Sequence, residues 1–575
     1  MQLELVAVLA LWFGCTVTTV THAQSPYSSG YDRDDGTRQS RSVTYAAHGM
    51  AATSDLRATQ AAVEILQAGG SAVDAAIAAN AVLGVVEPMS CGIGGDLFSI
   101  CWSAADGQLT GLNASGRAPQ KATPAEFARR GLAEIPLTGP LSWTVPGCVS
   151  GWHDLHQKHG KLEWKQLFSP AIKLAEEGFP VAPVIARYWN GAESGLQQTA
   201  EASETFLISG RSPDEGDIFR NPRLAATYRL IAEQGATVFY QGTLATEIDR
   251  YSRTLDGGLL QLADLQAHSN EWVDPVSTTY RGYDIWELPP SGQGITALQM
   301  LNLIERHDVS AMRWGTPEWS HLLVESKKIA FADRAKFYAD MKMADVPVQE
   351  LISKEYAAQR HRLFRPDQAL MNVPAGDPKL VAGDTVYLCT VDKDRNCCSL
   401  IQSNYHGFGS QMVAGNLGFA IQNRGALFAL DDQHANVLAP GKRPFHTIIP
   451  AMVTKDGRPQ LVFGVMGGDM QPQGHVQVLA NWIDFGMNIQ MAGDVARIRH
   501  EGSASPTGEP EASGGGTVFV ESGVPTSTVE ALQAKGHSVR RGGSFGGYQA
   551  ILIDWQRGIL QGASESRKDG AALGY

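Results

Sequence analysis

The chain has 575 residues, a formal net charge of −12 at pH 7, 43% hydrophobic residues and 18% charged residues. This composition is typical of a folded globular protein, and the length leaves room for two or more domains or one large fused body. The acidic balance and the lack of a dense Lys/Arg cluster exclude a nucleic-acid partner, because phosphate neutralisation needs a basic face.

The N-terminal segment predicts export. The apolar run LVAVLALWFGCTVTTV is followed by THA, a small-residue cleavage site. We therefore expect a signal peptide over residues 1–23 and a polar leader over residues 24–45, and a soluble periplasmic or extracellular protein. Because Glu4 stands where a Lys or Arg is usual, an uncleaved N-terminal anchor is the open alternative. No later apolar run has the roughly 18 residues needed to span a bilayer.

Six cysteines remain once Cys15, which lies in the expected signal peptide, is removed. Their spacing fits neither a small disulfide-stapled scaffold nor a CxxC zinc pattern. Most lie in apolar, strand-like segments, so we predict buried thiols, with one disulfide as an open alternative. They are Cys91, Cys101, Cys148, Cys389, Cys397 and Cys398.

Residues 55–86 predict two packed helices, because Ala, Leu and Val form a continuous stripe that Gly69-Gly70 interrupts. The next segment, EPMSCGIGGDLFSICW, predicts a glycine-rich loop that runs into a strand. The loop lacks the Lys-Ser/Thr of a phosphate-binding loop and the GxGxxG spacing, so close backbone packing explains its glycines better.

The predicted secondary structure changes from mostly helices to mostly strands near Thr385. Residues 120–375 are predicted to be mostly helical, with amphipathic stretches such as PEWSHLLVESKKIAFADRAKFYAD. Beyond Thr385 we expect the strands TVYLCTV, CCSLIQSNY, FAIQN, TIIPAMV, QLVFGVM and YQAILID. Since earlier strands such as LFSICW and LTGLN are also expected, the pattern favours an α+β fold with helices packed over stacked sheets.

Two motifs resemble functional sites but lack necessary parts. GGSFG matches the GxSxG nucleophile elbow, yet that motif needs a later histidine as base and none follows His537. Ser544 is therefore expected to be a turn residue. DKDRN, from Asp392, begins like a calcium-binding EF-hand loop, but Cys397 and Ser403 stand where Gly and Glu are required. A hairpin turn between TVYLCTV and CCSLIQSNY explains this segment better.

Several ordered segments carry a resemblance to a known family. GDTVYLCTVDKDRN, GFGSQMVAGNLGFAIQN, APGKRPFHTIIPAMV, GVMGGDMQ and the terminal DGAALGY resemble the small subunit of the γ-glutamyltransferase (glutathione hydrolase) family in order and spacing. HGMAATSDLRATQAAVEILQAGGSAVDAAIAANAVLGVVEPMSCGIGGDLF resembles its large subunit. The resemblance runs from about Ala46 to Tyr575.

This resemblance implies a precursor that cuts itself between Asp384 and Thr385. It implies a large subunit over residues 46–384, a small subunit over residues 385–575, and the four-layer αββα sandwich of N-terminal nucleophile hydrolases. It also implies a small-molecule amide substrate, water or an amine as acceptor, and no metal or organic cofactor; a homodimer of two-subunit units stays open. The chemistry is sound in itself, because an α-amino group with a pKa of about 8 can activate the hydroxyl of its own residue.

The remaining catalytic groups of the family fall on matching residues. Ser403 replaces a threonine and keeps the hydroxyl that orients Thr385. Gly467-Gly468, after the strand QLVFGVM, can offer two unobstructed N–H groups to the oxyanion of a tetrahedral intermediate. The catalytic machinery is therefore expected to be intact.

The residues that hold the γ-glutamyl group in the family are almost all replaced. The replacements are Tyr405 for an Asn, Arg424 for a Gln, Leu427 for an Asp, His446 and Thr447 for two serines, and Ser115 for an Arg, with Arg117 as a candidate substitute for that arginine. Loss of the Asp removes a charge-assisted hydrogen bond to the substrate ammonium, worth roughly 1.5 to 3 kcal/mol. Arg424 would repel an ammonium and attract a carboxylate.

This altered pocket is similar to the acylase-like branch of the family, which includes cephalosporin acylases and oxamate amidohydrolase. We expect an exported, self-processing N-terminal-threonine amidohydrolase. Glutathione and related γ-glutamyl amides are the family's default substrates, and amides of carboxyl-bearing acids without an α-amino group are the alternative. An unprocessed, inactive binding protein is the rival from a different functional class.

Overall fold

The computed structural model describes residues 39–373 and 384–575. The expected signal peptide over residues 1–23 lies outside this range, so it stays a prediction. Two seven-stranded antiparallel sheets and their covering helices make the chain an α+β protein, as predicted. Over the described residues, no helix is both long and apolar enough to cross a membrane.

Sheet I contains the predicted nucleophile. Its strand order is β19-β2-β10-β11-β3-β4-β7, and all neighbours are antiparallel. The strands are β2 (Met50–Thr53), β3 (Asp96–Ser103), β4 (Gln108–Ala114), β7 (Glu271–Val273), β10 (Asp384–Val391), β11 (Cys397–Tyr405) and β19 (Ala571–Gly574). The turn between β10 and β11 is closed by Asp392, whose carboxylate accepts the N–H groups of Asp394 and Asn396. The hairpin interpretation of DKDRN is confirmed.

Sheet II has the order β1-β18-β17-β13-β12-β9-β8 and is also antiparallel throughout. Its strands are β1 (Thr44–Ala46), β8 (Val276–Tyr280), β9 (Tyr283–Glu287), β12 (Ala451–Lys455), β13 (Arg458–Met466), β17 (Gly547–Asp554) and β18 (Ile559–Ser564). The two sheets pack face to face, and a Cβ added at Gly464 in β13 would lie 2.5 Å from the ring of Tyr387 in β10. Glycine at this position therefore permits close approach of the sheets.

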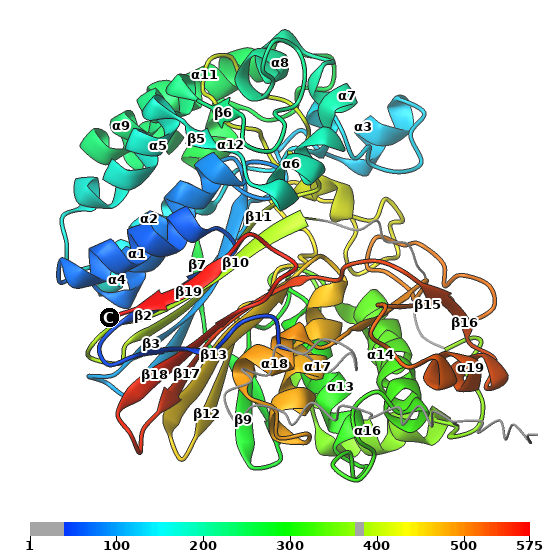
Figure 1. Cartoon of the computed structure of the whole chain (residues 1–575). Helices are drawn as coiled ribbons and strands as arrows, with labels where there is room; N and C mark the ends of the chain where they lie inside the picture. The colour runs from blue at the N-terminus through cyan, green and yellow to red at the C-terminus, as the bar shows by residue number, and fades with distance from the viewer. Residues whose placement is uncertain (1–38, 374–383) are drawn as a thin grey trace, which may run out of the picture.

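Both sheets mix strands from before and after Thr385. In sheet I, β10 and β11 lie between β2 and β3, and β19 lies on the other side of β2. In sheet II, the later strands β12, β13, β17 and β18 lie between the earlier strands β1 and β9. Figure 1, coloured by residue number, shows the red β19 beside the blue β2.

Helices cover the outer face of each sheet (Figure 1). The Ala-rich pair α1 (Leu56–Gln67) and α2 (Ala72–Val86) packs over sheet I, in one core with Val386 and Leu388 of β10. The alternate residues of the strand, Tyr387 and Cys389, face the core between the sheets. β10 is thus buried on both faces, which explains its nearly continuous apolar sequence.

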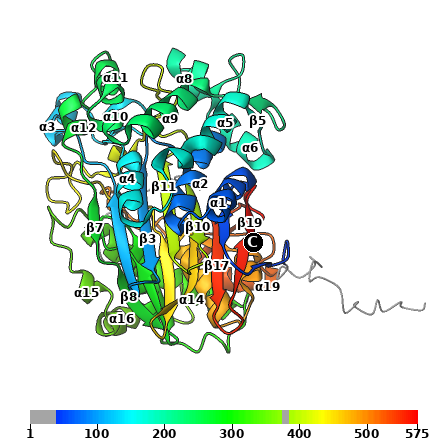
Figure 2. The ribbon, with the colours of Figure 1, turned by 90° about the vertical axis from the view of Figure 1, so that its left-hand side faces the viewer.

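Sheet II is covered by α13 (Gly294–Ile304), α14 (Pro317–Phe337) and α17 (Met470–Ile483). Figure 1 and Figure 2 both show α5, α8, α9 and α11 gathered beyond α2 at one end of the molecule. The remaining elements are α3 (Pro124–Arg129), η1 (Pro140–Ser142), α4 (Cys148–His159), η2 (Trp164–Phe168), α5 (Ser169–Glu177), β5 (Phe179–Pro180), α6 (Pro183–Asn190), α7 (Glu193–Leu196), α8 (Ala200–Phe206), β6 (Ile218–Phe219), α9 (Pro222–Gln234), α10 (Thr237–Tyr240), α11 (Thr243–Ser252), α12 (Leu262–Gln266), α15 (Val348–Leu351), α16 (Lys354–Arg360), η3 (His361–Leu363), η4 (Arg424–Leu427), α18 (Ile489–Asp494), β14 (Ile498–Glu501), β15 (Thr517–Val520), α19 (Thr526–Ala534) and β16 (Ser538–Arg541).

Some expected elements after Thr385 were wrong. The predicted strand FAIQN is a loop that forms only an isolated bridge between Val413 and Ala420. The predicted strand TIIPAMV begins only at Ala451, as β12. The sequence pattern also missed α17, α18 and α19 in this part of the chain. By contrast, the predicted buried thiols are confirmed, since the six cysteines in the described ranges are all buried and free.

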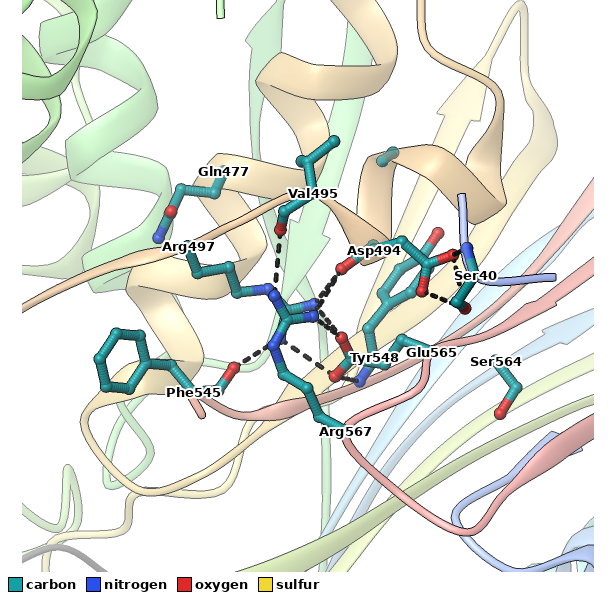
Figure 3. Close-up of polar contacts among 12 residues, drawn as sticks. Ser40, Gln477, Asp494, Val495, Arg497, Phe545, Tyr548, Ser564, Glu565 and Arg567 are labelled. Atoms are coloured by element: carbon teal, nitrogen blue, oxygen red, sulfur yellow. Dashed lines mark hydrogen bonds and ion pairs between the residues drawn. The ribbon is translucent and has the colours of Figure 1, made fainter. Parts of the chain in front are cut away.

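A buried ion network ties the end of the chain to the segment after α18. Glu565 is fully buried and accepts from Arg497, from Arg567 and from the Tyr548 N–H, and Figure 3 shows both guanidinium groups beside it. Arg567 also pairs with Glu521. Burial raises the pKa of Glu521, but Arg567 and Arg497 lower it overall, so the carboxylate is stabilised in its charged form.

Replacing Glu565 by glutamine is expected to destabilise the fold by about 3 to 5 kcal/mol, because two buried guanidinium groups lose their shared counter-charge. The midpoint of urea unfolding, followed by fluorescence, measures the change. Glu204→Gln is the matched control, since Glu204 is mostly exposed and pairs with Arg223 at the surface. Its removal should cost about 0 to 1 kcal/mol. Equal midpoints for the two variants would contradict a stabilising role for the buried network.

Candidate active site

Thr385 is the second residue of β10 and is only 1% exposed. Its Oγ1 donates a hydrogen bond to Ser403 Oγ, 3.2 Å away on the neighbouring strand β11. The pairing of the two strands is irregular here, because the register shifts between Asp384 and Val386. The ladder is therefore interrupted at the residue whose hydroxyl is predicted to react.

Ser403 also holds Tyr405, the last residue of β11, which pairs with Asp384 of β10. Its Oγ accepts the backbone N–H of Tyr405 at 2.8 Å. Tyr405 has a φ of 79°, a left-handed conformation that costs a non-glycine residue of the order of 1 to 2 kcal/mol. The bond from Ser403 helps to hold this conformation, which turns the chain out of β11 beside Thr385.

Gly467 and Gly468 follow β13, as predicted from the sequence, and lead into α17, which was not predicted. Their φ angles are 116° and 55°, values that favour glycine. The Gly467 carbonyl accepts the Met470 N–H, and the Gly468 carbonyl accepts the Gln471 N–H. Within the described residues, neither glycine N–H donates to an acceptor. Two backbone donors at the start of a helix are thus available to a developing negative charge.

Arg424 is a fully buried cation at the start of η4. Its Nη1 donates to Thr447 Oγ1 at 2.9 Å, and its guanidinium carbon lies 4.7 Å from the centre of the Tyr405 ring. Across the described part of the chain, its Nε and Nη2 atoms have no hydrogen-bond partner. Burial lowers the pKa of Arg424 to about 10, which still leaves it charged at neutral pH. A buried arginine with unused donors is suited to bind an anion.

His446 lies near the Arg424 guanidinium. Its Nε2 is 2.9 Å from Asp96 Oδ2, and burial, with Arg424 adding to the effect, lowers the pKa of His446 to about 4. The imidazole is therefore neutral at pH 7. Asp96, at the start of β3, is held in turn by the Gly116 N–H and by Gln422 Nε2, both at 2.8 Å.

The structure joins most predicted site residues in one chain of contacts. Thr385 bonds Ser403, Ser403 bonds the N–H of Tyr405, the Tyr405 ring stacks on Arg424, and Arg424 bonds Thr447. The Thr447 carbonyl is linked through the amide of Gln293 to the Gly468 carbonyl. Leu427, which the resemblance sets at the position of the family's Asp, is fully buried in the core over sheet II.

Arg117 contacts different residues. Its Nη1 donates to the Gly441 carbonyl and lies 3.7 Å from Asp340, and neither partner belongs to the contact chain. The arginine that contacts Ser115 is instead the buried Arg443, through the Ser115 carbonyl at 3.1 Å. Substrate binding by Arg117 stays a prediction. Arg443 was missed because it is separated from Ser115 by most of the sequence.

Two cavities flank this contact chain. One, of about 440 Å³, is lined by Gly467, Asp469 and Phe519, and the other, of about 370 Å³, by Tyr405 and Phe428. Both are also lined by Glu509. Gly467 therefore borders one cavity and Tyr405 the other, and each cavity is large enough for part of a small-molecule substrate.

Two other groups lie outside this centre. Ser544 of the GxSxG motif is exposed in the loop between β16 and β17, as expected of a turn residue. Among the described residues, one group could hold a metal ion: His321, Glu325 and His537. The two imidazoles bond each other at 2.8 Å, and Glu325 pairs with Lys328 at 2.9 Å, so hydrogen bonds and an ion pair already account for this group.

Comparisons with known proteins found relatives over most of the chain. The sequence profile of the gamma-glutamyltranspeptidase family matches residues 58–575. The chain is 36% identical to the glutathione hydrolase-like YwrD proenzyme of Bacillus subtilis (strain 168), over 90% of this chain and 96% of that protein. It is 35% identical to the oxamate amidohydrolase proenzyme of Klebsiella pneumoniae subsp. pneumoniae, over 92% and 98%. The crystal structure of cephalosporin acylase from Bacillus halodurans superposes with a TM-score of 0.86 and 41% identity, over 93% of this chain and 97% of that one.

Proposed function

Because this chain belongs to the gamma-glutamyltranspeptidase family, we propose that it is an amidohydrolase that uses Thr385 as its N-terminal nucleophile after cutting itself. The cut falls between Asp384 and Thr385 and separates the large-subunit region, residues 46–384, from the small subunit, residues 385–575, in an αββα N-terminal nucleophile hydrolase fold. The two relatives from Bacillus subtilis and Klebsiella pneumoniae are proenzymes, which supports this proposal.

The observation that carries the proposal is the contact between Thr385 Oγ1 and Ser403 Oγ at the irregular start of β10. In the processed protein, the free α-amino group of Thr385 takes the hydroxyl proton as Oγ1 attacks the amide carbonyl. The N–H groups of Gly467 and Gly468 stabilise the oxyanion. The amino group then passes the proton to the leaving amine, and water, activated by the same amino group, releases the acid from the acyl-threonine ester.

For the substrate, the geometry supports an acyl group with a distal carboxylate and no α-ammonium. The unused donors of Arg424 can bind the carboxylate, and Thr447 orients the guanidinium that presents them. Leu427 leaves no carboxylate at the position where the family binds an ammonium. An ammonium placed beside Arg424 would meet a like charge in a buried site, which is unfavourable.

Self-cleavage is expected in the purified protein. Mass spectrometry should find a fragment of residues 385–575, and sequencing of that fragment should begin at Thr385. The processed protein should hydrolyse simple acyl anilides without added metal. A chain that stays intact and still hydrolyses amides would refute the proposed mechanism, and an intact chain without activity would favour the binding-protein alternative.

A further inference from the structure

Gln293 occupies a central place in the contact network. It precedes α13 and is fully buried. Its Nε2 donates to two carbonyls, that of Thr447 at 2.7 Å and that of Gly468 at 2.9 Å. Its Oε1 accepts from Arg334 Nη1 at 2.5 Å. Both amide hydrogens are therefore committed to backbone oxygens on two separate segments.

Arg334 holds the next residue of the same turn. It comes from α14, is fully buried, and binds Asp469 through Nη1–Oδ1 at 2.6 Å and Nη2–Oδ2 at 3.1 Å. Its guanidinium carbon lies 3.8 Å from the centre of the Phe331 ring. The carbonyl of Gly468 and the carboxylate of Asp469 are thus fixed by two buried side chains that also bond each other.

Holding the Gly468 carbonyl and the Asp469 carboxylate restrains the backbone of the turn that contains them. A peptide unit is planar, so a bonded Gly468 carbonyl fixes the orientation of the whole Gly468–Asp469 peptide and restrains the ψ angle of Gly468. Glycine offers no side chain to restrain it otherwise. The same amide holds the carbonyl of Thr447, whose hydroxyl is bonded by Arg424. One side chain therefore joins the oxyanion turn to Thr447 and, through Thr447, to Arg424, the proposed carboxylate-binding residue.

We propose that Gln293 is a positioning residue that sets the oxyanion turn, residues 467–469, relative to Arg424 and Thr447, the residues proposed to bind the acyl group. This inference rests on the proposed function, because it assigns Gln293 a part in amide hydrolysis at Thr385. Gln293 does not touch the substrate; it acts through Gly468 and Thr447. Its loss should affect both turnover and acyl-group selectivity, since the two segments are held by the same amide.

Gln293→Met and Gln293→Glu test this role. Methionine has a similar length and lacks both donors and the acceptor, whereas glutamate keeps the acceptor for Arg334 but cannot donate to the two carbonyls. We expect kcat for glutaryl anilide to fall about 10- to 100-fold in both variants, because a misplaced oxyanion donor costs transition-state stabilisation. The preference for glutaryl over butyryl anilide should fall about 3- to 10-fold as Thr447 is released.

Gln299→Met is the matched control. Gln299 lies on α13, the helix that Gln293 precedes, and is buried, but it bonds Asp333 and the Tyr338 hydroxyl instead of the turn or Thr447. We expect it to lower the unfolding midpoint as much as Gln293→Met, while kcat and selectivity stay within about threefold of the unmodified protein. Slow or absent self-cleavage in the Gln293 variants, with normal cleavage in Gln299→Met, would also support the proposal.

The results that would refute the positioning role of Gln293 differ from those that would refute the proposed function. If the unmodified protein is processed and active, and either Gln293 variant keeps both kcat and acyl selectivity, the positioning role is refuted while the proposed function stands. Equal kinetic losses in Gln299→Met would also refute it, since a general loss of packing would then suffice. If the unmodified protein neither cuts itself nor hydrolyses amides, the proposed function fails first.

Discussion

Thr385→Ala is expected to give one uncut, folded chain whose amide hydrolysis is at least about 10⁴-fold slower than that of the unmodified protein. Self-cleavage and turnover both need the same hydroxyl, and removal of a nucleophile abolishes the covalent route completely. Gel electrophoresis under denaturing conditions reads out cleavage, and hydrolysis of an acyl anilide reads out turnover. The unchanged fold is checked by circular dichroism.

Two further variants separate the hydroxyl from other effects. Thr385→Ser keeps the hydroxyl and should both cut itself and retain measurable turnover. Ser544→Ala removes the serine of the GxSxG motif, which lies in an exposed loop, and should leave cleavage and turnover unchanged. If the alanine variant at Thr385 stayed active while Ser544→Ala did not, the nucleophile would have to be reassigned.

The second large effect concerns the acyl group. The unmodified protein is expected to prefer glutaryl anilide over γ-glutamyl anilide by about one to two powers of ten in kcat/KM, since one pocket charge is worth about 1.4 to 2.8 kcal/mol. Arg424→Gln should lower kcat/KM for glutaryl anilide by a similar factor and leave butyryl anilide almost unchanged. The double variant Arg424→Gln/Leu427→Asp should shift the preference toward γ-glutamyl anilide.

Arg117→Gln serves as the control arginine. It contacts Gly441 and Asp340, so a small effect on selectivity is expected if Arg424 alone recognises the carboxylate. The single Arg424 variant keeps the test decisive even if a buried aspartate at position 427 prevents folding. A strong preference of the unmodified protein for γ-glutamyl anilide would refute the carboxylate assignment and return the protein to glutathione hydrolase chemistry.

Local patterns predicted the parts of the fold whose contacts are local. The hairpin of β10 and β11 and the pair of α1 and α2 follow from alternation, helical periodicity and turn residues. The strand predicted for FAIQN failed for a physical reason: its backbone bonds scattered partners, such as the Gly94 carbonyl for Gln422 and the Asn404 carbonyl for Asn423. Among the described residues these partners lie on separate segments and form no continuous ladder, so an apolar segment with strand-like residues remains a loop.

The candidate site was also predictable only where its residues lie in local sequence patterns. Thr385, Ser403 and the glycine pair lie in segments with recognisable sequence patterns, and the structure places the first two in contact. Gln293 and Arg334 gave no signal, because their role depends on partners more than a hundred residues away in the chain. Such a network becomes visible only when the hydrogen bonds of each buried polar group are traced.

The mixing of early and late strands in both sheets has a consequence for the life of the processed protein. Before the proposed cut, folding is a reaction of one chain, and its rate does not depend on concentration. After the cut, the pieces stay joined, because separating them would expose unpaired strand edges and the core between the sheets. Once unfolded, however, two chains must meet again before either sheet can form, so recovery becomes second order. Processing would thus convert a reversibly folding precursor into an enzyme that persists mainly because it unfolds slowly.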